Sequence, residues 1–154
     1  MWQRRKPVRA ASQIVSIRWR MNRSAAGKAA VLELIASAQV VVENFRPDTM
    51  RRLGLDYASV LAVNPQIVYC SLSAFGAHGP LRDKQGLDVV LQAMSGLMSI
   101  TGERDSHPGG GPQKVGVAVT DIMTGLYSTI AIMAALAARE KTGAGQHIDM
   151  ALLD

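Results

Sequence analysis

Residues 39–43 read Gln39-Val40-Val41-Val42-Glu43, an unbroken run of apolar β-branched residues between two polar ends. Short runs of this kind are typical of a strand in a parallel sheet that is covered on both faces. Ile67-Val68-Tyr69-Cys70-Ser71-Leu72-Ser73 predicts a second strand of the same kind. The two runs therefore indicate an α/β fold built on a mostly parallel sheet.

The segments around these strands predict helices with recognisable ends. Ser24 can cap a helix that begins at Ala25, and Pro47 suits the first turn of a short helix that Gly54 ends. Asp56 can cap another short helix. The expected helices are 25–38, a short one between 47 and 54, 57–63, 87–98 and 120–141, the last closed by Gly143, and a final strand is expected at 148–153. This order predicts a layered α/β fold in which helices cover the sheet.

The longest predicted helix contains seventeen consecutive uncharged residues, Ile122 to Ala138. That length is at the short limit for a membrane span. Asp121 precedes the stretch directly, Arg139-Glu140 follow it, and several hydroxyl residues lie within it. We therefore interpret it as a buried core helix and expect no membrane association.

The net charge of +5 arises from one end of the chain. Residues 1–23 carry seven basic and no acidic side chains, whereas residues 24–154 carry ten basic and twelve acidic ones, a net charge of −2. A basic arm that also holds Trp2 and Trp19 is compatible with binding to nucleic acid or an anionic membrane. We favour a poorly ordered terminal segment at 1–23 and a folded domain at 24–154, with no nucleic-acid partner.

Cysteine and histidine usage argues against a metal site. Cys70 is the only cysteine, so no internal disulfide can form, and a reducing compartment such as the cytoplasm fits best. His78, His107 and His147 share no ligand spacing.

Three features are candidates for chemistry. Asp121 opens the longest helix, where the helix dipole and unpaired amides favour an ionised carboxylate that can attack a carbonyl, although an acid there is often only a cap. Arg46, Arg51 and Arg52 follow the first strand, where arginines can bind phosphate or simply cover a solvated helix. The glycine-rich loop 102–113 matches no P-loop or dinucleotide fingerprint, and it is either a lid or a mobile surface loop.

Six motifs in order carry a resemblance to a known family. They are Val40-Val41-Val42-Glu43-Asn44-Phe45-Arg46-Pro47 with Arg52-Leu53-Gly54-Leu55; Asn64-Pro65-Gln66-Ile67-Val68-Tyr69; Ser73-Ala74-Phe75-Gly76 with Gly79-Pro80; Gln92-Ala93-Met94-Ser95-Gly96; Val117-Ala118-Val119-Thr120-Asp121; and Thr142-Gly143-Ala144-Gly145-Gln146. Together they resemble the class III coenzyme A transferases over residues 24–154. The resemblance implies an incomplete Rossmann-like large domain.

The resemblance also implies an activity and its residues. Asp121 would attack an acyl-CoA thioester to give a mixed anhydride, and the released CoA thiolate would return to give an aspartyl-CoA thioester that passes CoA to a carboxylic acid. CoA and acyl-CoA would be substrates, with no permanently bound cofactor. The implied CoA contacts are Asn44, Phe45, Arg46, Arg52, Gln85, Gly86, Leu87 and Asp88, although the family often has an aromatic residue where Leu87 stands.

The chain departs from the family pattern in length, because it lacks the family's opening βα segment and the small domain that follows. Family members form interlocked homodimers, and we expect this for the full-length protein. We expect the isolated chain to lack transferase activity and to expose apolar surface. Two alternatives stay open: a CoA-thioester racemase of the same superfamily, and an inactive truncated product.

Overall fold

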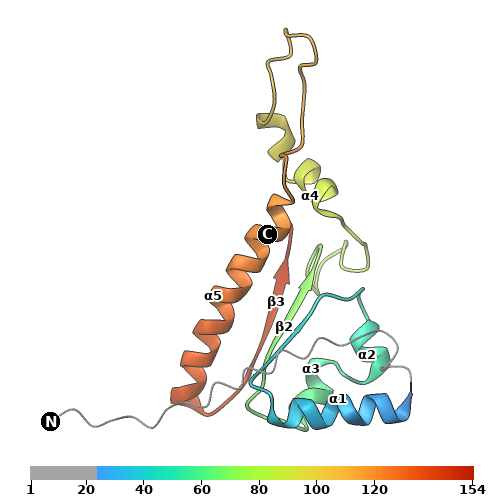
Figure 1. Ribbon diagram of the computed structural model, residues 1–154, viewed down its shortest axis with the longest axis vertical. Helices are drawn as coiled ribbons and strands as arrows, with labels where there is room; N and C mark the ends of the chain where they lie inside the picture. The colour runs from blue at the N-terminus through green and yellow to red at the C-terminus, as the bar shows by residue number, and fades with distance from the viewer. Residues whose placement is uncertain (1–23) are drawn as a thin grey trace, which may run out of the picture.

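A computed structural model of the chain describes residues 24–154, and these form a three-stranded parallel sheet with helices on both faces (Figure 1). The predicted basic segment 1–23 lies outside the described residues. In chain order the elements are α1 (Ala25–Ser37), β1 (Val40–Glu43), α2 (Thr49–Leu53), α3 (Tyr57–Leu61), β2 (Val68–Ser73), α4 (Asp88–Met94), the 3₁₀ helix η2 (Leu97–Ile100), α5 (Val119–Thr142) and β3 (Gln146–Ala151).

The strands lie in the order β1-β2-β3, and all are parallel. Glu43 in β1 is level with Ser71 in β2, and Ser71 is level with Asp149 in β3. Because side chains alternate between the faces of a sheet, these three point to the same face. The register thus places a row of three polar side chains across the sheet, near the carboxyl ends of the strands.

The core lies between one face of the sheet and the helices α1, α2 and α3. Ile35 of α1, Val60 of α3 and Tyr69 of β2 are among its buried members. The phenol of Tyr69 donates a hydrogen bond of 2.9 Å to the carbonyl of Leu55, which satisfies the polar end of a buried ring. Two predicted helix ends are confirmed: Ser24 accepts a bond from the amide of Gly27, and Gly54 ends α2 in a left-handed conformation. Two others are wrong, because Asp56 makes no side-chain cap bond to α3, and Pro47 precedes the cap residue Asp48 instead of lying in the first turn of α2.

Helix α5 lies on the opposite face, against β2 and β3 (Figure 1). Its bounds agree with the sequence prediction, and Gly143 ends it with φ of 72°. The interpretation as a buried core helix is wrong for the described chain, because only Thr124, Ser128 and Ala135 are buried along its length, whereas the expected exposure of apolar surface is found on this helix. By length and composition α5 could cross a membrane, a test that core helices of soluble proteins also pass. Val42 in β1 is likewise half exposed, and α5 packs mainly against the other two strands, β2 and β3.

The segment predicted as one helix, 87–98, is two. Helix α4 ends at Met94, and Gly96 adopts a left-handed φ of 80° before η2 begins. The final strand lies two residues earlier than predicted, at Gln146–Ala151. The loop that follows η2 projects far from the sheet before the chain returns to start α5 (Figure 1).

Candidate active site

Asp121 is the third residue of α5, at the end nearest the carboxyl edge of the sheet (Figure 1). Its side chain is exposed and, within residues 24–154, accepts no hydrogen bond that would make it a cap. The cap is instead supplied by Asp88 at the start of α4. Its Oδ1 accepts bonds from the amides of Thr120 (2.8 Å) and Asp121 (3.2 Å) and from the Thr120 hydroxyl. The capping role that the sequence offered for Asp121 therefore belongs to Asp88.

The pKa values of Asp121 and Asp88 are shifted in opposite directions. Partial loss of hydration beside the helix start raises the pKa of Asp121 above its usual value even though the side chain is exposed, and the negative charge of Asp88 raises it further. Burial alone would also raise the pKa of Asp88, but hydrogen bonds from Thr120, Gln92 and the Asp121 amide outweigh it and hold that pKa below the usual value. The expectation that the helix start favours ionised Asp121 does not match this arrangement, because Asp88 occupies the amides that would do so.

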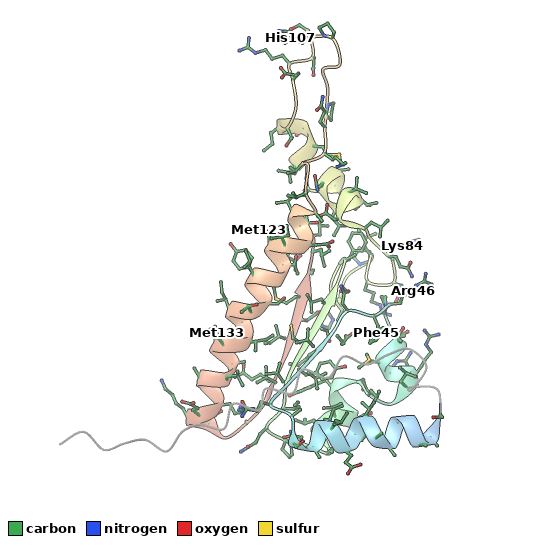
Figure 2. The ribbon with its side chains drawn as sticks, in the orientation of Figure 1. Phe45, Arg46, Lys84, His107, Met123 and Met133 are labelled. Carbon is green, nitrogen blue, oxygen red and sulfur yellow. The ribbon has the colours of Figure 1, made fainter. Side chains whose placement is uncertain are left out.

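A cavity of about 460 Å³ lies at the carboxyl ends of β1 and β2. Phe45 and Arg46, on the segment that leaves β1, form part of its wall (Figure 2). Arg51 and Arg82 line the same cavity. A second hollow of about 290 Å³ shares Arg46 and is lined by Arg52 and Gln85. The structure thus brings four of the eight predicted CoA contacts to two adjoining hollows.

The other four predicted contacts lie elsewhere. Asn44 is exposed and does not line either hollow. Gly86 packs tightly, since a Cβ there would lie 2.8 Å from side-chain atoms of Ala74 and Leu91. Leu87 is 72% exposed, and Asp88, the first residue of α4, accepts a bond from the amide of Thr120 at the start of α5. Four of the predicted contacts therefore line the hollows, Asp88 lies beside Asp121 at the start of α5, and Asn44, Gly86 and Leu87 line neither hollow.

The floor of the larger cavity contains side chains that motif analysis did not single out. Oγ of Ser71 lies 3.0 Å from Nε2 of His147, and the His147 ring stacks on Tyr57 with centroids 4.9 Å apart. Asp149 accepts a bond of 2.8 Å from the amide of Ala77. Burial raises the pKa of the neighbouring Glu43, although bonds from the Phe45 amide and Ser71 oppose the shift. The only sequence signal that could have predicted this cluster is the alternation of side chains along each strand, combined with the register between the strands.

Within residues 24–154, no three His, Cys, Asp or Glu side chains gather in a way that could hold a metal ion. The buried Cys70 lies in the centre of β2, where burial raises the pKa of its thiol. The chemistry available at the two groups of residues is therefore that of carboxylates, arginines and a serine–histidine pair.

Comparisons with known proteins identify the family. The family model described as "CoA-transferase family III" matches residues 22–154. The chain is 53% identical over 128 residues to a succinate–glutarate CoA-transferase of Agrobacterium fabrum, covering 83% of this chain and 31% of the relative. It is 45% identical over 123 residues to a succinyl-CoA:glutarate CoA-transferase of Mus musculus, covering 80% and 27%.

A solved structure of a CAIB/BAIF family protein from Brucella suis has the same fold, with a TM-score of 0.82 and 50% identity over 86% of this chain and 34% of that one. This likeness confirms the α/β fold class with a parallel sheet. The chain spans about a third of the length of the relatives that it matches. With the family model matched over the whole described part, the chain belongs to the CoA-transferase family III.

Proposed function

We propose that the protein transfers coenzyme A from an acyl-CoA thioester to a carboxylic acid, with Asp121 as the nucleophile. The Asp121 carboxylate attacks the thioester carbonyl, the C–S bond breaks, and a mixed anhydride and CoA thiolate form. The thiolate then attacks the aspartyl carbonyl, which releases the acyl group as a carboxylate and leaves an aspartyl-CoA thioester. The acceptor carboxylate repeats these two steps in reverse order, so that Asp121 is regenerated.

One observation carries this proposal: Asp121 is exposed at the start of α5 while Asp88 takes up the nearby amides. A carboxylate that is not engaged as a cap is available to attack. Its raised pKa also points to a functional group, since perturbed acids cluster at active sites. An Asp121 that capped its own helix would have its lone pairs occupied.

The two hollows support a role in binding CoA. Arg46 lies in both of them, and Arg52 lines the smaller one. Guanidinium groups bind phosphate oxygens in pairs of hydrogen bonds, and Phe45 offers a ring on which a base can stack. We propose that these residues hold the nucleotide end of CoA. The named relatives act on succinate and glutarate, which makes a short dicarboxylic acid the proposed acceptor.

The racemase alternative requires a proton-transfer group on each side of an α-carbon. The racemase branch has a histidine just before the aspartate of its Gly-x-Asp motif, and here that position is Leu87, which cannot carry a proton. We therefore propose transfer without α-proton exchange. For the whole protein we further propose a cytoplasmic, interlocked homodimer.

The test uses a chimera in which this chain replaces the matching residues of the Agrobacterium relative. Asp121→Asn should abolish transfer and leave CoA binding within about twofold, whereas Asp105→Asn, in the exposed loop 102–113, should change neither. Mass spectrometry after hydroxylamine trapping should show a modified Asp121 in the parent chimera. Full activity of Asp121→Asn would refute the assignment, and rapid deuterium uptake at the α-carbon without transfer would favour the racemase.

A further inference from the structure

Gln92 in α4 is a polar residue whose side chain is buried, with only 1% of the residue exposed. Its Nε2 donates to Oδ2 of Asp88 (2.6 Å) and to the carbonyl of Val117 (3.2 Å), and its Oε1 accepts from the amide of Val115 (2.8 Å). Both amide protons and the oxygen are thus engaged. Because a buried amide is costly unless it is bonded, these three contacts hold Gln92 in one orientation.

The contacts of Gln92 lead to the first turn of α5 by two routes. The first runs through Asp88, one helical turn earlier in α4, whose other oxygen binds the amides of Thr120 and Asp121. The second runs along the backbone, because Val115 and Val117 lie four and two residues before Val119, where the helix begins. Gln92 therefore fixes both the cap of α5 and the chain that enters it.

We propose that Gln92 is a positioning residue that sets the place of the Asp121 carboxylate without touching the reacting atoms. This inference rests on the proposed function of Asp121. An apolar residue of similar size could occupy this buried position, so packing alone does not explain the amide. A displacement of about 1 Å at a reacting group can lower a rate by about 100-fold, which makes the orientation of the helix start consequential.

The first experiment measures backbone hydrogen exchange in the 154-residue chain. Gln92→Met keeps the shape and removes all three bonds, whereas Gln92→Glu keeps the acceptor for Val115 and turns an acceptor oxygen toward Asp88. In both, exchange of the Thr120 and Asp121 amides should accelerate at least tenfold more than that of Tyr69 in β2. The matched control is Gln113→Met, which removes one bond to Gly109 in an exposed loop and should leave these amides unchanged.

A second measurement needs no variant. As Asp88 takes up a proton in the unmutated chain, the side-chain amide of Gln92 and the backbone amide of Thr120 should shift in the NMR spectrum with one common midpoint. In the hydrogen-exchange experiment, equal acceleration at the amides of Thr120, Asp121 and Tyr69, or no acceleration at any of them, overturns the inference. The absence of any shift at Gln92 during that titration overturns it as well, even where both variants fail to fold.

The rate measurement separates this inference from the proposed function. In the chimera, Gln92→Met should slow labelling of Asp121 by acyl-CoA about 10- to 100-fold and change the KM for acyl-CoA by less than about twofold. If the parent chimera never labels Asp121, the proposed function fails and the exchange data still judge the contacts of Gln92. Labelling at the parent rate in Gln92→Met, alongside accelerated exchange, would refute the positioning role alone.

Discussion

The exposed stripe of α5 predicts that the 154-residue chain associates with itself. Ile122, Leu126, Ile130 and Met133 are spaced at 4, 4 and 3 residues, so they lie along one side of the helix. Each is between 52% and 66% exposed. Replacing Ile130 by lysine would put a charge in the middle of this apolar stripe.

The size of the effect follows from these exposures. Fully burying an aliphatic side chain contributes about 1.5–3 kcal/mol, so covering the exposed half contributes about 1–1.5 kcal/mol. Two copies that cover each other's stripe gain about 10 kcal/mol in all, and we take an association cost of about 5 kcal/mol, close to the lower end of the range of about 4–15 kcal/mol. The net of about 5 kcal/mol corresponds to a dissociation constant of about 0.2 mM. Ile130→Lys removes one contact from each copy and buries a charge, which should abolish association below about 1 mM.

Sedimentation velocity between 20 µM and 1 mM measures this association. The unmutated chain should shift from monomer to larger species over that range, and Ile130→Lys should stay monomeric throughout. Val63→Lys provides the control, because Val63 is 41% exposed but lies outside the stripe, just after α3. A chain that is monomeric at 1 mM, or one in which both lysine variants behave alike, would show that the stripe does not drive association.

Three further predictions concern stability, each measured by urea unfolding at low protein concentration. Gly145→Ala should destabilise the chain by about 1–3 kcal/mol, because the added Cβ would collide with the backbone of Gln66 and Ile67. Gly116→Ala is the control, since Gly116 has open space around it and the change should be nearly neutral. Equal effects of the two substitutions would show that the collision does not cause the loss of stability. Tyr69→Phe should cost about 1–3 kcal/mol by leaving the buried Leu55 carbonyl without its bond, and no loss would show that another donor replaces it. Burial raises the pKa of Glu43 above its ordinary 4.5, so the folded state holds that proton more tightly than the unfolded state. The resulting stabilisation is complete below pH 4.5 and is lost as pH rises through the raised pKa. Glu43→Gln should remove this contribution to the fall in the free energy of unfolding with rising pH.

Local sequence signals predicted most of the fold. Gly54 and Gly143 end helices where the sequence placed their ends, because left-handed conformations there depend on the glycine itself. Gly96 acts in the same way but lies inside an apolar stretch, and the helix prediction ran through it. The exposed apolar surface of α5 agrees with the expectation for the isolated chain, but which side of the helix is exposed depends on what packs against it.

The candidate site was predictable only in part. The position of Asp121 at a helix start followed from the pattern of the long apolar segment. Its neighbour Asp88 is 33 positions away, and the carboxylate that caps α5 is set by how α4 meets that helix. The bonds of Gln92 and the pairing of Ser71 with His147 likewise depend on contacts between distant segments, which no local pattern contains.

The parallel order of the sheet has a consequence for how the chain acquires its cavity. β1 and β2 can pair as soon as α2 and α3 have formed between them, which requires closing only a short loop. β3 arrives much later, since Ser71 and His147 are 76 positions apart and α4 and α5 must be made first. Long-range parallel pairing is slow to form. During synthesis the arginine-lined side of the cavity would therefore form before the side that β3 supplies, and the cavity would be completed around Ser71 only when β3 docks.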